Sequence, residues 1–422
     1  MIKQVVLQHK AEKEALLSRS YIARDNLATA TELLGSDLIK IITGPRRAGK
    51  SVFSFLLLKD RPFAYLNFDD ENLLKVENYD EIIKTVFEVY PRSDFIFFDE
   101  IQNLKNWELF VNKLHRRGHN LILTGSNANL LNKELASVLT GRFSALEVLP
   151  FSFKEFLRAG NFTATREDME LPEIKGGTLN RLDEYMRTGG FPEVVVKNLD
   201  PKSYLETLFD SVLFKDVVKR YKVRYSQKIY DLALYLVSNV CSEFTFTRLR
   251  KTLEFRSTST VQKYLAALEE SYLFFSLNRF SFKTTERIRA PKKIYLVDNG
   301  FVPAKSFQFS ANSGKLMENL VFLALLRKGN RPNKDLFYYK TRNGREVDFV
   351  VKEGFKVSRL IQSCLDVEKD AAAAREMKAL HEAGEELSCS ELSVVTWDTE
   401  RTELFKGREI RFIPLWRWLD ES

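Results

Sequence analysis

The segment GPRRAGKS, at Gly44–Ser51, constrains the fold of this chain more than any other feature. It matches the pattern G-x-x-x-x-G-K-[ST], in which a glycine-rich loop surrounds phosphate groups. The apolar, β-prone run Leu38–Thr43 precedes the loop, and the apolar, helix-prone run Val52–Lys59 follows it. A strand, a glycine loop and a helix in this order predict a phosphate-binding unit within an α/β fold that has a parallel sheet.

Each position of the loop has a physical role in binding ATP. Gly44 and Gly49 allow the backbone to curl so that its N–H groups point at phosphate oxygens. Lys50 is expected to neutralise the β- and γ-phosphates, and Ser51 to bind Mg²⁺. The predicted nucleotide-binding residues of this loop are Gly44, Pro45, Arg46, Arg47, Ala48, Gly49, Lys50 and Ser51.

A second apolar run, Phe95–Phe98, ends in two acids, Asp99 and Glu100. Four consecutive aromatic or aliphatic residues are typical of a parallel strand that is buried on both faces. Ligands bind at the carboxyl ends of such strands, so Asp99 is expected to bind Mg²⁺ and Glu100 to polarise the attacking water. The alternative is that these acids cap the following helix.

A third run, Asn120–Asn127, ends in small polar residues, of which Ser126 and Asn127 are candidates for contacting the γ-phosphate. The alternative is an ordinary turn after a strand. Arg142 follows a helical stretch and a glycine. It is a candidate for stabilising the transferred charge, either in its own subunit or in a neighbouring one. Its alternative is a solvated surface arginine.

The middle of the chain is mainly helical. Between residues 151 and 225 the apolar pattern has a helical period that breaks at Gly189-Gly190. We expect a helical lid over the nucleotide here, and a plain helical connector is the alternative. Residues 226–285 predict a winged helix-turn-helix, with three amphipathic helices followed by a basic hairpin wing. The predicted DNA contacts are Arg248, Arg250, Lys251, Arg256 and Lys263.

The last part of the chain contains acids within apolar segments. Glu318 lies in a predicted buried helix, and Asp348 lies in a strand that follows the turn Asn343-Gly344. A phosphodiesterase site needs several carboxylates and usually a lysine around a metal ion. The next strand brings Gln362 and Cys364 instead, and a neutral amide is a weaker ligand for a hard cation. This pattern predicts a degenerate nuclease site of Glu318, Asp348 and Gln362. The alternative is that hydrogen bonds, or Lys340 and Arg345, hold the two acids.

The ordered motifs GPRRAGKS, FFDEIQ, LTGSNANLL, LTGRF, LPFSFKEF, TGGFPEVV, KKIYLVDNGF, MENLVFLALLR and YYKTRNGREVDFVV span nearly the whole chain. In this order they resemble a family of AAA-type P-loop ATPases from archaea and bacteria. Members of this family carry a winged helix and a C-terminal restriction-endonuclease-like domain of unknown function. The resemblance implies four parts: an ATPase core over 1–150, a lid over 151–225, a winged helix over 226–285 and a nuclease-like domain over 286–422. It also implies that Lys50, Ser51, Asp99, Glu100 and Arg142 form the ATPase site.

Composition limits the partners. Lys and Arg total 65 against 57 Asp and Glu, a formal charge of +8, which permits a nucleic-acid partner. Three scattered cysteines favour a reducing cytoplasm, and no apolar run is long enough to predict a membrane span. We therefore expect a cytoplasmic protein that uses ATP and Mg²⁺, binds DNA and forms a homo-oligomer if Arg142 acts on a neighbour. A protein partner for the winged helix and the nuclease-like domain is the alternative.

Overall fold

A computed structural model describes residues 1–126, 139, 141–165, 167–306, 313–367 and 370–421. The chain divides into two compact units. The first comprises Met1–Phe151 with Glu270–Tyr272, and the second comprises Ser152–Glu269 with Leu273–Ser422. Within the described residues, no helix is long and apolar enough to cross a bilayer.

The first unit is built on a five-stranded sheet whose order is β2-β3-β4-β1-β5, and each neighbouring pair is parallel. This confirms the predicted α/β class and its parallel core. The strands are β1 (Ile39–Thr43), β2 (Phe63–Asn67), β3 (Phe95–Asp99), β4 (Asn120–Gly125) and β5 (Phe143–Glu147). Because β1 lies between β4 and β5, the chain reverses its direction of winding beside β1, where open α/β sheets bind ligands.

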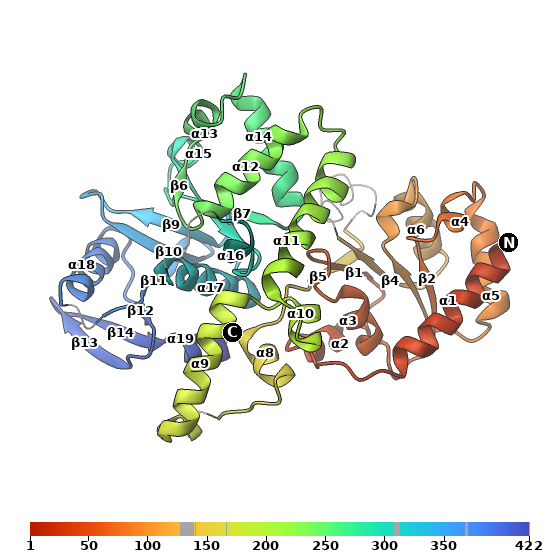
Figure 1. The fold of residues 1–422 in the computed structure, drawn as a ribbon, viewed down its shortest axis with the longest axis horizontal. Helices are drawn as coiled ribbons and strands as arrows, with labels where there is room; N and C mark the ends of the chain where they lie inside the picture. Colours follow the sequence, from red (N-terminus) through yellow and green to blue (C-terminus); the bar gives the residue numbers. More distant parts are fainter. Residues whose placement is uncertain (127–138, 140, 166, 307–312, 368–369, 422) are drawn as a thin grey trace. The chain divides into compact units, whose positions relative to one another are not determined.

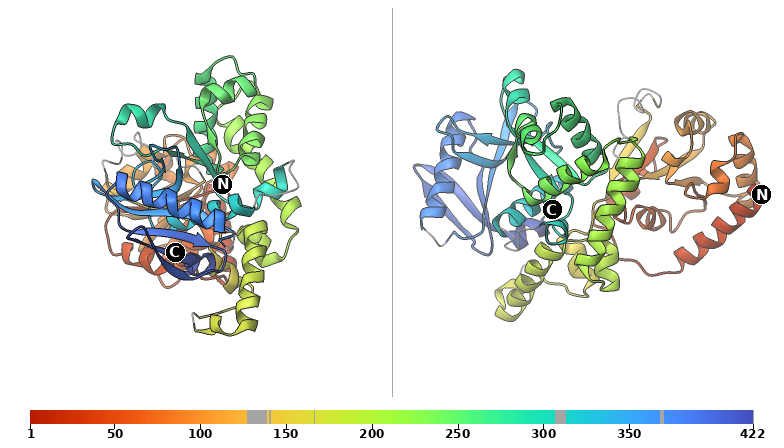
Figure 2. Two further views of the ribbon diagram at one scale, coloured as in Figure 1. Left: turned by 90° about the vertical axis from the view of Figure 1, so that its left-hand side faces the viewer. Right: turned by 45° about the horizontal axis from the view of Figure 1, so that its top comes forward.

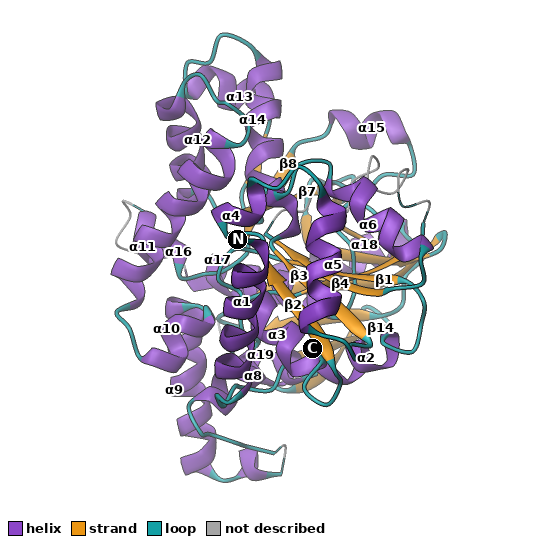
Figure 3. Cartoon of the chain, turned by 90° about the vertical axis from the view of Figure 1, so that its right-hand side faces the viewer, coloured by secondary structure: helices purple, strands orange, loops and turns teal. Residues whose placement is uncertain are grey.

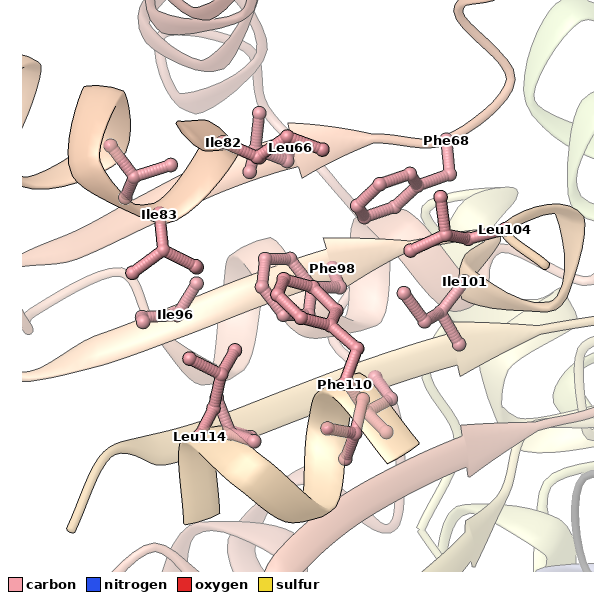
Figure 4. Close-up of a cluster of buried hydrophobic side chains, with 14 of the residues drawn as sticks. Leu66, Phe68, Ile82, Ile83, Ile96, Phe98, Ile101, Leu104, Phe110 and Leu114 are labelled. Carbon is pink, nitrogen blue, oxygen red and sulfur yellow. The ribbon is translucent and has the colours of Figure 1, made fainter. Parts of the chain in front are cut away.

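Helices cover both faces of this sheet, as Figure 3 shows for the side of α1 and α5. The alternating side chains of β3 explain the two layers: Ile96 and Phe98 enter one apolar cluster, and Phe95 and Phe97 enter the other. Figure 4 shows the first cluster around Phe98 and Phe110. The helices are α1 (Ile2–Leu17), α2 (Leu27–Leu33), α3 (Lys50–Leu57), α4 (Glu71–Leu74), α5 (Tyr79–Val89), η1 (Ile101–Asn103) and α6 (Trp107–Arg116).

The second unit begins with a run of helices (Figure 1). The predicted break at Gly189-Gly190 is confirmed, because one helix ends at Thr188 and the next begins at Pro192. The last helix of the run continues over Val212–Lys219 as a π-helix. The elements are α8 (Phe153–Ala159), η3 (Asp168–Glu170), α9 (Pro172–Thr188), α10 (Pro192–Lys197), α11 (Pro201–Ser211) and η4 (Val212–Lys219).

The break after α9 is fixed by a buried acid from a distant part of the sequence. Asp298 accepts hydrogen bonds from the backbone N–H groups of Gly190, at 2.7 Å, and Gly300, at 2.9 Å. Gly189 has φ +77°, and a Cβ added there would lie 1.7 Å from Asp298 Oδ1. Only glycine fits this position without moving Asp298 away from its two donors.

Replacing Gly189 by alanine is therefore expected to destabilise the second unit by about 1–3 kcal/mol, through unfavourable φ and overpacking. Gly176→Ala is the matched control, because Gly176 lies within α9 and a Cβ there meets nothing within 4 Å. That control is expected to be neutral or slightly stabilising. Urea denaturation of both variants measures the difference, and equal midpoints would contradict the steric argument.

The segment predicted as a winged helix contains three helices and a small antiparallel sheet. The sheet order is β6-β8-β7, so its central strand is the last in sequence and lies beyond residue 285. Instead of the expected hairpin wing, a short helix joins β7 to β8, and none of its residues is buried. The elements are α12 (Ser226–Ser238), β6 (Glu243–Phe244), α13 (Phe246–Thr252), α14 (Thr258–Glu270), β7 (Phe274–Asn278), α15 (Thr284–Arg289) and β8 (Lys292–Leu296).

The C-terminal part contains a mixed six-stranded sheet of order β13-β14-β12-β11-β10-β9, drawn in blue in Figure 2. In β10, Val350 packs into the apolar cluster that includes residues of α18, whereas the ring of Phe349 lies near those of Tyr295 on β8 and Phe322 on α17. The predicted Asn343-Gly344 hairpin joins β9 to β10. The elements are α16 (Phe301–Lys305), α17 (Ser313–Arg327), β9 (Leu336–Lys340), β10 (Glu346–Glu353), β11 (Lys356–Cys364), α18 (Asp370–Glu386), β12 (Leu392–Thr396), β13 (Arg401–Phe405), β14 (Arg408–Pro414) and α19 (Leu415–Asp420).

Candidate functional site

The glycine loop leaves the carboxyl end of β1 and leads into α3, as the sequence predicts. At its start, Gly44 has φ +145°, and a Cβ there would lie 2.1 Å from the carbonyl oxygen of Val148. The loop can therefore approach the segment after β5 only with glycine at this position. Lys50 is buried, and its Nζ donates a hydrogen bond to the carbonyl oxygen of Pro45 at 2.9 Å, so the ammonium group lies across the loop.

The loop and the end of β3 meet through Ser51 and Asp99. Ser51 Oγ donates to Asp99 Oδ1 at 3.0 Å, although β4 separates β1 from β3 in the sheet. Two further hydroxyl groups donate to the same carboxylate, from Thr124 on β4 and, at 3.3 Å, from Tyr65 on β2. The structure thus brings together the two predicted Mg²⁺ ligands and adds two residues that the sequence analysis missed. The sequence contained one indication that Thr124 belongs to the site, because this residue lies near the end of the third predicted strand.

The electrostatics of Asp99 fit a cation site. Burial and the nearby charge of Glu100 raise the pKa of Asp99 to about 6, while hydrogen bonds from Thr124 and Ser51 and the charge of Lys50 act in the opposite direction. A buried carboxylate with a raised pKa is stabilised in its charged form by a nearby cation. One hydroxyl and one carboxylate oxygen are also the hard donors that Mg²⁺ prefers, so this site fits the metal.

Glu100 directly follows β3 in a left-handed conformation, with φ 51°. Its backbone N–H donates to Thr124 Oγ1 at 3.1 Å, and its carboxylate accepts a hydrogen bond from the side-chain amide of Gln102. The Glu100 side chain makes no capping hydrogen bond to the helix that follows. The helix-cap alternative therefore finds no support, and the half-buried carboxylate is held at the same edge of the sheet as the loop.

The remaining residues predicted to bind nucleotide are Ser126, Asn127 and the two arginines of the loop. Ser126 directly follows β4 at the same edge, and its buried Oγ has no hydrogen-bond partner within the described part of the chain. Asn127 lies outside the described residues. Of the two loop arginines, Arg46 is half-buried and Arg47 is exposed with φ 66°.

Arg142 is exposed at the amino end of β5, where its carbonyl oxygen accepts from the N–H of Ile39 at the start of β1. The phosphate loop begins after the opposite end of this five-residue strand. At about 3.3 Å per residue, the two ends are separated by roughly 17 Å. The fold therefore does not bring Arg142 to the phosphate loop of its own chain.

The five predicted DNA contacts lie on α13, on α14 and in the turn between them. Arg248, Lys251, Arg256 and Lys263 are exposed, and Arg250 is half-buried. Within the residues that the structure describes, none of the five forms an ion pair with an acid within 4.0 Å. Their charges are thus available at the surface of this helical pair.

The acids predicted as a degenerate nuclease site are close together in the C-terminal part, around a lysine that the sequence analysis did not identify. Lys293 Nζ lies 2.8 Å from Glu318 Oε1, 2.7 Å from Glu346 Oε1 and 3.0 Å from Asp348 Oδ1. Tyr295 also donates to Glu318 Oε1, at 2.8 Å. We call Lys293, Glu318, Glu346 and Asp348 the lysine–carboxylate cluster.

Lys293, Glu318 and Asp348 of the cluster are buried, and Glu346 is half-buried. Burial alone would lower the pKa of Lys293, but Glu318, Tyr295, Asp348 and Glu346 together raise it well above its usual value. Burial and the charge of Asp348 raise the pKa of Glu318 to about 8. Lys340 and Arg345, the partners considered for these acids from the sequence, pair elsewhere: Lys340 with Glu243 and Glu346, and Arg345 with Glu382.

Gln362 and Ser363 of β11 take part in the hydrogen bonds around Asp348. Gln362 accepts from the backbone N–H of Asp348 at 3.0 Å and donates to Glu376 at 2.6 Å. Ser363 donates to Asp348 Oδ2 through its backbone N–H, at 3.0 Å, and its hydroxyl, at 2.9 Å. Burial raises the pKa of Cys364 to about 11, so its thiol is protonated at neutral pH.

Comparison with known proteins adds to this geometry. Residues 36–157 match an AAA domain, residues 179–311 match a domain of unknown function, DUF8612, and residues 313–418 match another, DUF4143. Solved structures with detectable similarity include the Walker-type ATPase paby2304 of Pyrococcus abyssi, with 16% identity and a TM-score of 0.40 over 68% of this chain and 98% of that chain. Cdc6p from Pyrobaculum aerophilum has 12% identity and a TM-score of 0.26 over 73% and 97%.

Two relatives align along most of their length. The uncharacterized protein MJ1544 of Methanocaldococcus jannaschii is 32% identical over 443 aligned positions, which cover 99% of this chain and 98% of that protein. An uncharacterized protein of Haemophilus influenzae is 30% identical over 363 positions, which cover 81% and 86%. With its AAA domain and its phosphate loop, the chain belongs to the archaeal and bacterial family of P-loop ATPases that includes MJ1544.

Proposed function

We propose that this chain is a Mg²⁺-dependent ATP hydrolase that binds or remodels DNA. The contact between Ser51 Oγ and Asp99 Oδ1, 3.0 Å apart, carries the first half of the proposal. It brings a loop hydroxyl and a strand-end carboxylate together beside Lys50, which is the ligand pair expected for Mg²⁺ in P-loop proteins. The metal, when bound, would neutralise charge on the phosphates.

The residues of this chain then divide the work of hydrolysis. The loop N–H groups and Lys50 hold the phosphates, and Glu100 orients and polarises the attacking water. Ser126 and Asn127 contact the γ-phosphate. The position of Arg142 at the opposite edge of the sheet favours a role on the site of a neighbouring subunit, which requires a dimer or a ring.

The DNA half of the proposal rests on residues 226–296. In chain order this part runs α12, β6, α13, α14, β7, α15 and β8, and its three strands form a sheet of order β6-β8-β7. This order of helices and strands supports a winged helix. Four exposed basic side chains on α13, on α14 and between them provide charge for phosphate contacts (Arg248, Lys251, Arg256 and Lys263). In this arrangement α14 would enter the major groove.

The lysine–carboxylate cluster favours a second candidate for the C-terminal part. A phosphodiesterase needs carboxylates that are open to a metal ion, whereas Glu318 and Asp348 are occupied by the ammonium group of Lys293. We propose that the nuclease-like domain does not cut. The second candidate function is accordingly an ATP-gated scaffold that binds a protein partner through this domain and the winged helix.

Measurement of ATP turnover with and without DNA tests the proposal and separates the two candidates. Turnover is expected to rise when duplex or single-stranded DNA is added, and supercoiled DNA recovered after incubation with Mg²⁺ or Mn²⁺ is expected to be intact. DNA affinity, measured by fluorescence anisotropy, is expected to fall as salt is added. A plot of the logarithm of the binding constant against the logarithm of the salt concentration should have a slope of about −0.9 for each phosphate contact. The triple variant Arg248→Glu, Arg256→Glu, Lys263→Glu should remove most of that binding.

The matched control has the same change of charge at exposed lysines elsewhere in the second unit: Lys202→Glu, Lys334→Glu, Lys356→Glu. It is expected to retain most of the affinity. Absence of DNA binding at low salt, with ATP turnover intact, would reject the DNA half and favour the scaffold. Cleavage of DNA that Asp348→Ala abolishes would reject the proposal that this domain does not cut.

A further inference from the structure

The phosphate loop is contacted by Arg24, which lies in the irregular segment between α1 and α2. The side chain is buried with 9% of its surface exposed. One nitrogen of its guanidinium, Nη1, donates to the carbonyl oxygen of Ala48 at 2.9 Å. The other, Nη2, donates to the carbonyl oxygen of Leu149, and the group lies 5.2 Å from the ring centroid of Phe151. All these residues belong to the first unit.

The bond to Ala48 fixes the orientation of one peptide group of the loop. The Ala48–Gly49 peptide is planar and trans, so its C=O and N–H bonds point in opposite directions. Because the carbonyl of Ala48 points toward Arg24, the N–H of Gly49 must point away from Arg24. A positive charge on the carbonyl also polarises the peptide, which strengthens the N–H as a donor.

The bond to Leu149 connects the same guanidinium to the segment after β5. That segment already meets the start of the loop, where a Cβ on Gly44 would collide with the carbonyl of Val148. Gly44 contacts this segment directly, and Ala48 is connected to it through Arg24. A guanidinium suits this role because its planar fork reaches two carbonyl oxygens at fixed angles, whereas a lysine offers a single point charge.

We propose that Arg24 is a positioning residue of the nucleotide site, which orients the Gly49 N–H toward the phosphates of the bound nucleotide. This inference rests on the proposed function, since it assumes that the loop binds ATP. Arg24 lies outside the matched AAA domain, which begins at residue 36. It acts through the loop backbone, so its loss should weaken nucleotide binding more than the chemical step.

The experiment compares Arg24→Met, Arg24→Lys and the control Arg19→Met, which changes an exposed arginine of the same segment. Titration with ATP and ADP gives Kd, steady-state kinetics give KM and kcat, and thermal melting without nucleotide reports folding. Arg24→Met is expected to raise Kd and KM about tenfold or more, because a hydrogen bond to a charged group is lost, with kcat within about twofold. The Kd and KM of Arg24→Lys should lie between those of Arg24→Met and the wild type. Arg19→Met should have the same Kd and KM as the wild type.

If Arg24 only stabilises the fold, Arg24→Met should lower the melting temperature and leave Kd unchanged. That result, or equal Kd values for Arg24→Met and Arg19→Met, overturns the inference. If Arg24→Met does not fold, an unchanged Kd for Arg24→Lys overturns it instead. A wild-type chain that binds no nucleotide overturns the proposed function and this inference together, whereas a wild-type chain that binds nucleotide without hydrolysing it overturns only the proposed hydrolysis.

Discussion

Replacing Glu100 by glutamine is expected to lower the rate of ATP hydrolysis by a factor of about 10²–10⁴, while ATP binding stays close to that of the wild type. The carboxylate is half-buried at the end of β3, beside the contact between Ser51 and Asp99. Glutamine preserves the size of the side chain but cannot accept a proton from water. The variant should therefore retain ATP, which measurements of bound and released nucleotide after a single addition would detect.

Two comparisons make this test specific. Lys50→Ala is expected to lose nucleotide binding itself, because the ammonium group that neutralises the phosphates is removed. Glu77→Gln makes the same chemical change at an exposed glutamate of the first unit and should behave as the wild type. If Glu100→Gln hydrolyses ATP at the wild-type rate, Glu100 is not the residue that activates water.

Replacing Lys293 by methionine is expected to reduce the free energy of unfolding of the second unit by about 3–5 kcal/mol. The methionine keeps a long apolar side chain but removes the ammonium group shared by Glu318, Glu346 and Asp348. Glu318 and Asp348 would then remain at buried positions, and Glu346 at a half-buried one, without the ammonium group that they share. Denaturation with urea, followed by a spectroscopic probe of the second unit, measures the loss.

Further substitutions test whether the loss comes from charge rather than from shape. Lys292→Met, one residue earlier on β8, changes a half-buried lysine and should cost much less. Glu318→Gln should also cost little stability. Because the pKa of this carboxyl is raised to about 8, the group is largely uncharged at neutral pH, as glutamine is. A Lys293→Met protein as stable as the Lys292→Met protein would contradict this account.

The features that the sequence predicted well are local ones. Lys50, Ser51, Asp99 and Glu100 each lie within a few residues of a strand end, and β1 and β3 are marked by continuous apolar runs. In a parallel sheet the carboxyl ends of the strands share an edge, so identifying the strands was enough to place these side chains together.

The features that it missed depend on pairs of residues far apart in the sequence. Lys293 lies 25 positions from Glu318 and 55 from Asp348, and a lysine at the start of an apolar strand carries no indication of which carboxylates it meets. Arg24 lies 125 positions from Leu149 and occurs in a segment with no periodic pattern. Periodicity reports which face of an element is apolar, but it does not report which distant polar group that element meets.

The helix α15 shows a different limit. Its segment is polar and basic, and none of its residues is buried, so there was no apolar stripe from which a helix could be predicted. The predicted wing lay within residues 226–285, almost entirely before this helix.

The position of β8 has a consequence for how this protein can be divided or recombined. Its backbone forms the centre of the sheet with β6 and β7, while the side chain of Lys293 reaches carboxylates on α17 and β10. A fragment that begins after Leu296 would lack that lysine, and one that ends before Lys292 would lack the central strand of its small sheet. Exchange of the C-terminal sheet between relatives would therefore require that the strand β8 of the resulting chain carries a cation for these carboxylates.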